Sequence, residues 1–207
     1  MINRAYRGRR APTASRGHDI YQLQIVLREL EPLIWRRLQV PGTLTLDRLH
    51  RVLQQVMGWT GAHLHEFVIG GRRYAEPDRK RGPTVGLPER RVRLCDVAPA
   101  VNVRFGYRYD LGDDWRHEVL VERILTAGEG GLVSTCLAGE RHCPPEDCGG
   151  VGGYEEFLAA IRDTGHPRHD ELLKWVGGKF DPDSFDLDRV NRALAASKGA
   201  GGTTRRA

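Results

Sequence analysis

Residues 101–121, VNVRFGYRYDLGDDWRHEVLV, contain the pattern that decides the fold class of this chain. Large apolar side chains alternate with polar or small ones on both sides of a short turn at 111–114: Val101, Val103, Phe105, Tyr107, Tyr109, then Trp115, His117, Val119, Val121. A period of two is typical of a strand with one buried face. Two such runs joined by a turn rich in Gly and Asp predict an antiparallel hairpin.

Further strands and one strong helix are predicted upstream of this hairpin. Residues 20–27 alternate in the same way, and residues 33–40 form a second run between Pro32 and Pro41. Apolar residues at helical spacing over 46–57 predict a helix that begins after Thr45 and ends at Gly58. Residues 65–76 predict a second hairpin, because Gly70-Gly71 can adopt the positive φ values of a tight turn.

Downstream, residues 126–152 look irregular, and helices are predicted at 154–165, 170–178 and 186–196. Residues 77–92 are expected to form a charged surface loop. The predicted fold is therefore α+β: a single domain of antiparallel β hairpins packed against helices, with a helical C-terminal third. We expect residues 18–197 to form this domain, and residues 1–17 and 198–207 to be disordered tails.

The chain is basic, but its charge is concentrated at the two ends. Residues 1–17 and 198–207 together carry eight Arg or Lys and no acid, which exceeds the net charge of +5, so residues 18–197 carry a net charge of −3. Weak nucleic-acid contact is therefore expected through the tails and not through the body. No apolar run is long enough for a membrane helix or a signal-peptide core, so a cytoplasmic location without membrane contact is expected.

The turn of the central hairpin is the first candidate site. Asp110, Asp113 and Asp114 crowd one end of it, and His117 follows on the returning strand. Such a group could perform general acid–base chemistry or bind a hard cation. The alternative is structural: Asp113 or Asp114 would accept hydrogen bonds from backbone N–H groups, and Asp110 would pair with an arginine.

Cys136, His142, Cys143 and Cys148 form a second candidate site. Thiolates and an imidazole in one irregular stretch are the ligands of structural zinc, although the spacing differs from the common paired Cys-x(2–4)-Cys arms. The alternative is that these are reduced, buried side chains in a Gly/Pro-rich turn. Cys95 is predicted to be a core residue.

A third candidate is the His63-x-His65 pair. In an extended segment both imidazoles would point to one face, and His117 could complete a three-histidine metal site. The alternative is that these rings form hydrogen bonds within the domain. The chain lacks a phosphate-binding Gly-x4-Gly-Lys-Ser/Thr loop and a Gly-x-Ser-x-Gly nucleophile motif, so no complete catalytic set is evident.

Three blocks resemble the plasmid pRiA4b ORF-3-like family: IWRRLQVPGTLTLDRLHRVLQQVMGW with HLHEF, FGYRYDLGDDWRHEVLVE, and CPPEDCGGVGGYEEFL. The resemblance covers about residues 19–196 and implies a compact α+β domain of bacteria and some archaea with no settled activity. Some relatives are labelled resolvase or repressor. The polar positions that match the family pattern are His63, His65, Asp110, Gly112, Asp113, Trp115, His117, Pro144, Pro145, Glu146, Asp147 and Cys148.

Three functions follow from these observations. The first is a binding or accessory domain without catalytic activity. The second is a metal-dependent enzyme or a zinc-stabilised domain that uses one of the three candidate sites. The third is a DNA-associated protein of the mobile-element or regulatory type, which would act through the basic tails.

Overall fold

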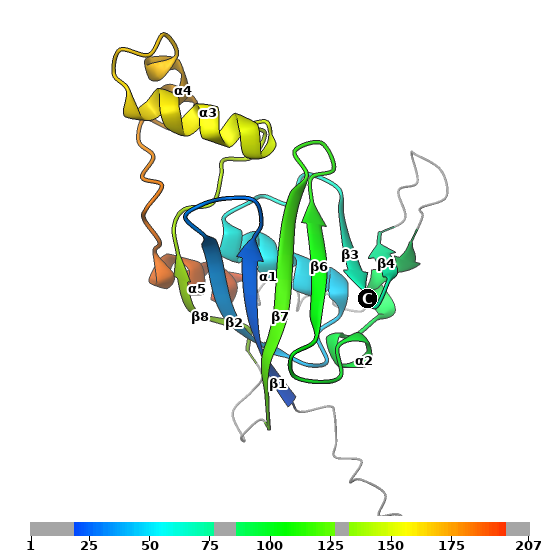
Figure 1. Ribbon diagram of the computed structural model, residues 1–207. Helices are drawn as coiled ribbons and strands as arrows, with labels where there is room; N and C mark the ends of the chain where they lie inside the picture. The colour runs from blue at the N-terminus through cyan, green and yellow to red at the C-terminus, as the bar shows by residue number, and fades with distance from the viewer. Residues whose placement is uncertain (1–18, 77–85, 127–132, 198–207) are drawn as a thin grey trace, which may run out of the picture.

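The computed structural model describes residues 19–76, 86–126 and 133–197. Within these ranges, eight strands form one sheet in the order β5-β4-β3-β6-β7-β1-β2-β8 (Figure 1). β4 and β5 run parallel, and the other neighbours are antiparallel, so the sheet is mixed. The strands are β1 (Asp19–Leu27), β2 (Ile34–Pro41), β3 (His65–Ile69), β4 (Arg72–Ala75), β5 (Leu87–Pro88), β6 (Arg104–Tyr109), β7 (Trp115–Thr126) and β8 (Thr135–Glu140).

Both predicted hairpins are confirmed. β6 pairs with β7 so that Tyr107 lies opposite His117 and Tyr109 lies opposite Trp115. β3 and β4 are joined by Gly70 and Gly71, which both have positive φ. The alternating residues of β6 and β7 therefore supply large aromatic side chains to one face of the sheet, where Tyr107, Tyr109 and Trp115 are almost fully buried.

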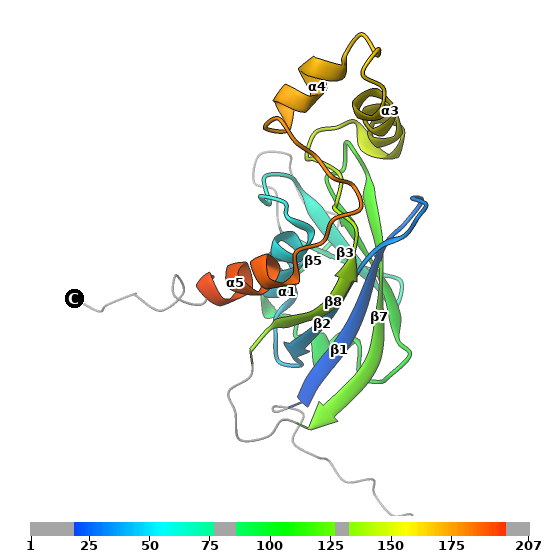
Figure 2. The ribbon, with the colours of Figure 1, turned by 90° about the vertical axis from the view of Figure 1, so that its left-hand side faces the viewer.

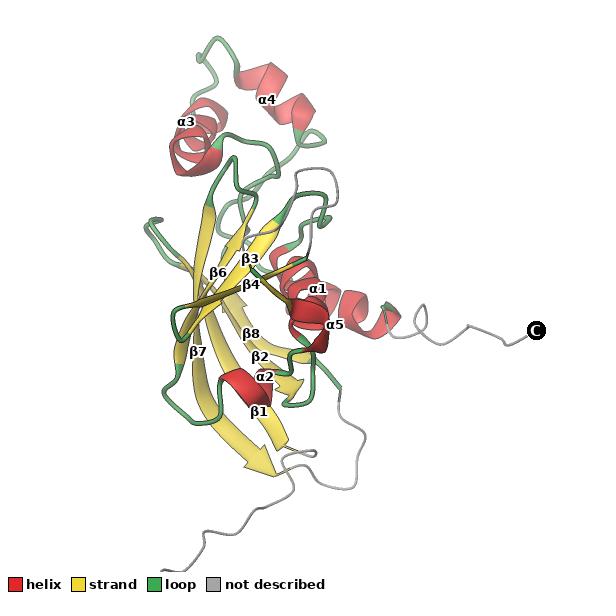
Figure 3. Ribbon diagram, turned by 90° about the vertical axis from the view of Figure 1, so that its right-hand side faces the viewer, coloured by secondary structure: helices red, strands yellow, loops and turns green. Residues whose placement is uncertain are grey.

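One face of the sheet is covered by α1 (Leu46–Met57) and α5 (Leu187–Ala196), as Figures 2 and 3 show. α1 follows Thr45 and ends at Gly58, whose φ of 86° is left-handed, as predicted. Its apolar stripe, including Leu46, Leu49 and Leu53, is fully buried. Burial of this stripe against the sheet is the main source of helix stability, because isolated helices of this length are marginal in water.

Arg36 on β2 is a charged residue at the centre of this packing, with an exposed fraction of 2%. Its guanidinium donates hydrogen bonds to four backbone carbonyl groups, those of Trp35, Val56, Glu140 and Arg141. It also lies 4.3 Å from the ring centroid of Phe185. Arg36 therefore links β2 to α1 and to the end of β8.

α3 (Gly150–Arg162) and α4 (His169–Trp175) pack together beyond one end of the sheet (Figures 1 and 3). Their contact is aromatic: the ring of Phe157 meets those of Trp175 at 5.9 Å and Phe180 at 5.1 Å, both edge to face. Two short elements, η2 (Glu89–Arg91) and α2 (Leu94–Val97), complete the described fold.

The predicted arrangement of helices was wrong, although the general α+β class holds. The helices are not gathered into a C-terminal third, because α1 and α2 lie between strands and α1 is a central part of the core. The sheet is mixed and not purely antiparallel. Part of the stretch expected to be irregular forms β8, which is held by pairing with β2 and by two hydrogen bonds between Cys136 and Asn191 of α5.

The predicted tails, residues 1–17 and 198–207, lie outside the described residues, as does most of the expected 77–92 loop. At the end of that loop, residues 87–91 form β5 and η2. Within the ranges that the structure covers, none of the helices combines the length and the apolar character that crossing a membrane requires.

Candidate functional site

The turn between β6 and β7 lies against the loop that precedes α3. The hydroxyl of Tyr109 donates a 2.5 Å hydrogen bond to Glu146, and the backbone N–H of Gly149 donates to Asp113 at 3.1 Å. A third segment, which follows α1, joins them: the indole N–H of Trp59 donates to the carbonyl of Pro144 at 2.9 Å. The YRYDLGDDWRHE and CPPEDC stretches, distant in the sequence, therefore form one structural unit.

His63, Asp110 and Asp147 meet at this junction, one from each segment. His63 Nδ1 lies 3.5 Å from Asp110 Oδ2, and His63 Nε2 lies 3.2 Å from Asp147 Oδ1. One ligand atom from each residue can be chosen so that all three lie within 4.8 Å of one another. Among the described residues, these are the three His, Cys, Asp or Glu side chains that converge closely enough to share a metal ion.

Asp110 is held in position by the turn itself. Its Oδ1 accepts hydrogen bonds from the backbone N–H groups of Gly112 at 2.9 Å and Asp113 at 3.3 Å. Asp110 is 8% exposed, and its second carboxylate oxygen, Oδ2, faces His63. The structural alternative for the turn agrees with the structure in part: Asp113 accepts a backbone N–H group, that of Gly149, but Asp110 accepts the N–H groups of the turn, whereas the arginine contacts belong to Asp114.

Asp114 carries the arginine contacts. Its carboxylate accepts hydrogen bonds from Arg116 at 2.5 Å and from Arg108. Partial burial opposes ionisation, but these two hydrogen bonds outweigh it and hold the pKa of Asp114 below its ordinary value. Asp114 is therefore a paired carboxylate on the outer side of the hairpin, and Asp113 is occupied by the N–H of Gly149.

His117 lies in the core, away from the three carboxylates of the turn. It is 3% exposed, its Nδ1 is 3.1 Å from the carbonyl oxygen of Trp115, and its ring meets Trp59 edge to face at 5.5 Å. Burial lowers its pKa to about 4, so the ring is neutral at pH 7. His117 does not join the Asp110 group or the His63 and His65 pair as a ligand within the described part of the chain.

The cysteine group is dispersed through the packing. Cys136 and Cys143 are buried, and Cys143 Sγ lies 3.2 Å from the sulfur of Met57. His142 points its Nδ1 at the carbonyl oxygen of Cys143, 2.7 Å away. Burial raises the pKa of the Cys136 and Cys143 thiols, and raises that of Cys148 to about 12. Cys136, His142, Cys143 and Cys148 do not converge closely enough to share a metal ion in the described part of the chain. Cys95 is buried, as predicted.

His65 belongs to a neighbouring polar pocket of about 440 Å³ between α1 and β3. Its Nε2 is 3.0 Å from the buried carboxylate of Glu89, and its ring stacks on that of His50 at 3.5 Å. Burial, reinforced by His65 and Arg51, lowers the pKa of His50 to about 3. His63 is part of the lining of this pocket, whereas Asp110 and Asp147 are not.

Sequence reasoning missed Asp147 as a site residue, as well as His50 and Glu89 in the pocket. Asp147 stands beside Cys148 in a conspicuous motif, and that proximity was an available clue. His50 looks like an ordinary polar position of an amphipathic helix, and Glu89 lies in a charged loop. The sequence around His50 or Glu89 looks like that of an ordinary solvent-exposed residue, because the partner of each side chain comes from a distant segment.

Two known proteins are similar to this chain. The protein named "Uncharacterized protein y4hQ" of Sinorhizobium fredii is 38% identical over 180 residues, which cover 85% of this chain and 91% of that protein. The crystal structure of a protein of unknown function, MM3350 from Methanosarcina mazei Go1, matches with a TM-score of 0.73 and 35% identity, covering 82% of this chain and 96% of that one. Residues 19–189 match the family described as Plasmid pRiA4b ORF-3-like protein, and the chain belongs to that family.

Proposed function

We propose that this chain is a binding domain whose ligand is a divalent transition-metal ion held by His63, Asp110 and Asp147. The supporting observation is that one imidazole nitrogen and two carboxylate oxygens from three separate segments lie within 4.8 Å of one another. The side chain of Asp147 is 71% exposed, so it can move to shorten the distances between the donor atoms when a metal binds.

The donor set favours a borderline metal. Imidazole suits Zn²⁺, Fe²⁺ and Ni²⁺, whereas carboxylates also suit Mn²⁺, so a mixed set of one nitrogen and two oxygens selects against Ca²⁺ and Mg²⁺, which prefer oxygen alone. Three protein ligands leave at least one coordination position for water or a bound molecule. That position would face the pocket whose edge His63 lines.

Outer contacts support two of the three ligands. Asp110 is oriented by the N–H groups that its Oδ1 accepts. The loop that carries Asp147 is fixed through Glu146, which accepts hydrogen bonds from the Tyr109 hydroxyl and from the backbone N–H of Thr60 at 3.0 Å. Partial burial opposes ionisation of Glu146, but these hydrogen bonds lower its pKa overall. Such outer contacts are typically worth ten- to a hundredfold in metal affinity.

Protons compete with the metal at this site. In the metal-free protein the imidazole of His63 lies between the carboxylates of Asp110 and Asp147. Imidazole and carboxylate groups bind a metal only when they are deprotonated, so the apparent metal affinity should fall on acidification.

Metal titration of chelator-stripped protein tests the proposal. We expect about one Zn²⁺ or Mn²⁺ per chain by calorimetry, and a loss of affinity of about tenfold or more in His63→Ala and Asp110→Asn. Asp188→Asn, which removes an exposed carboxylate of α5, is the matched control and should bind as the unmodified protein does. Binding that is absent at ~1 mM free metal, or equal in all variants, would refute the site.

The other functions considered from the sequence remain predictions. Association with DNA would depend on the basic residues of 1–17 and 198–207, which lie outside the described residues. Comparing the full chain with residues 18–197 in DNA binding at two salt concentrations tests that prediction directly. A catalytic role for the Asp110 hairpin also remains a prediction. So does a role in mobile elements, which none of the contacts described above supports.

A further inference from the structure

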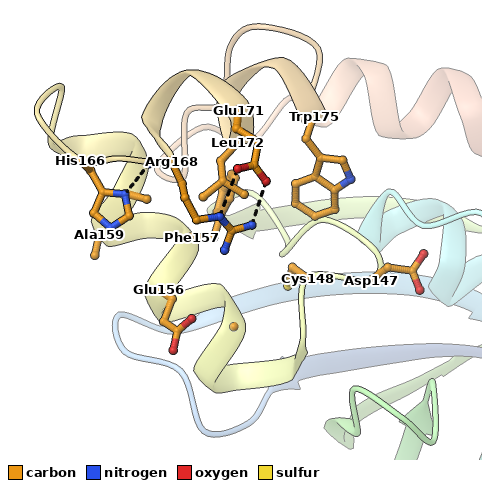
Figure 4. Close-up of a pocket in the computed structure, with 12 residues that line it drawn as sticks. Asp147, Cys148, Glu156, Phe157, Ala159, His166, Arg168, Glu171, Leu172 and Trp175 are labelled. Atoms are coloured by element: carbon orange, nitrogen blue, oxygen red, sulfur yellow. Dashed lines mark hydrogen bonds and ion pairs between the residues drawn. The ribbon is translucent and has the colours of Figure 1, made fainter.

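A second cavity, which shares Asp147 with the proposed metal site, lies between α3, α4 and the 147–148 segment. Its volume is about 690 Å³, which is within the range of sites that take small molecules. On the α3 side the lining includes the small residues Gly153, Ala159 and Ala160, and on the α4 side it includes Arg168, Glu171, Leu172 and Trp175. Figure 4 shows Trp175 at the end of this cavity where Asp147 and Cys148 lie.

Trp175 supplies an accessible aromatic surface. Its residue is 46% exposed although it packs edge to face against Phe157, which is 2% exposed. An indole held in place on one side and open on the other is the strongest aromatic partner for a cation. Leaving it open to water also forgoes the free energy that burial of its apolar surface would contribute.

The charges around the cavity favour the same ligand. Three carboxylates line it, those of Asp147, Glu156 and Glu171, against one guanidinium, that of Arg168. Glu171 already pairs with Arg168 through two contacts of 3.0 and 3.3 Å, as Figure 4 shows. Glu156 has no hydrogen bond or ion pair with any residue in the described ranges, and its electrostatic interaction with Arg168 is weaker than that of Glu171, so the carboxylates of the lining outnumber its one guanidinium.

We propose that the cavity between α3 and α4 binds a small organic cation, an ammonium or guanidinium group on a short alkyl chain. Trp175 would contact the cation or its alkyl chain, and Glu156 would supply the opposite charge. This inference does not rest on the proposed metal site, since Trp175 and Glu156 are not among the proposed metal ligands and the two sites have only Asp147 in common.

Tryptophan fluorescence with agmatine as the probe tests this proposal on the full, metal-stripped chain. Agmatine carries an ammonium and a guanidinium group, and 1,4-butanediol is its uncharged counterpart. Trp175 is more accessible than Trp59 and Trp115, which are 6% and 1% exposed. Agmatine should therefore change the fluorescence emission of Trp175 in a saturable way. Butanediol should not, and raising the salt concentration should weaken binding.

Two neighbouring carboxylates of α3 provide a matched pair of variants. Glu156→Gln should weaken agmatine binding by about three- to tenfold, whereas Glu155→Gln, on the same exposed turn but outside the cavity, should leave it within about twofold. Trp175→Phe, which keeps an aromatic ring, should weaken binding measured by calorimetry. Because the chain is metal-stripped, this readout does not depend on occupation of the proposed metal site.

Three results would overturn the inference: no binding up to ~10 mM agmatine, equal binding of butanediol, or equal weakening by Glu155→Gln and Glu156→Gln. If an arginine-containing peptide binds and agmatine does not, the free cation is excluded as the ligand.

Discussion

Replacement of Gly150 by alanine should destabilise the protein, because this residue is where the loop before α3 touches the β6–β7 turn. Gly150 has a φ of +70°, and a Cβ atom at this position would lie 2.6 Å from the backbone carbonyl oxygen of Asp113. The left-handed backbone costs an alanine about 1–2 kcal/mol. Displacing a backbone carbonyl adds about 1–3 kcal/mol, and the lower entropy of the unfolded alanine chain returns about 0.5–1 kcal/mol. The expected net loss is about 1–4.5 kcal/mol.

Gly152, two residues further along the same helix, is the matched control. A Cβ atom there meets nothing within 4 Å, and its φ is not positive. Gly152→Ala should therefore stabilise the protein by about 0.5–1 kcal/mol, since alanine is the better helix former. The two alanine variants have the same composition and should move stability in opposite directions.

Urea unfolding, followed by circular dichroism and by tryptophan fluorescence, measures both variants. With m-values of about 1–3 kcal/mol/M, the two midpoints should differ by roughly 1 M or more. Gly150→Ala should also weaken metal binding, because it disturbs the loop that carries Asp147. A Gly150→Ala midpoint equal to that of Gly152→Ala would refute the close approach between this loop and the turn.

Two further predictions concern the core. The pKa of His117 is about 4 in the folded protein and ordinarily 6.5, so the unfolded chain takes up the proton first as the pH falls. The stability that the neutral, buried ring contributes is therefore complete above pH 6.5 and is lost as the pH falls towards 4. The loss is about 3 kcal/mol, and His117→Leu should flatten the dependence of the unfolding midpoint on pH over that window; an unchanged slope would contradict the assignment. Arg36→Lys should lower the free energy of unfolding in urea by about 3 kcal/mol, because an ammonium group cannot replace a guanidinium that donates to four carbonyl groups. The exposed control Arg104→Lys should lower it by under about 1 kcal/mol. Equal costs would show that the Arg36 network contributes little.

The parts of the fold that were predictable from sequence are those encoded by local periodicity. The alternation in 101–121 places Tyr107, Tyr109 and Trp115 on one buried face, and the helical spacing after Thr45 defines α1 within a residue of its observed ends. These patterns arise because a strand or a helix repeats its buried positions at a fixed interval. β8 escaped prediction because its strand form depends on pairing with β2 and not on its own weak alternation.

The sequence also marked most of the residues that matter without showing which of them meet. His63, Asp110 and the CPPEDC segment stood out by residue type, yet the proposed ligand combinations joined His63 to His65 and His117, and the cysteines to His142. Tertiary structure brings His63, Asp110 and Asp147 together instead, through the docking of one loop on a distant turn. It also buries His117 and opens the cavity beside Trp175. Periodicity fixes the face on which a side chain lies, whereas its partners across the fold depend on strand order and loop docking, which no local pattern encodes.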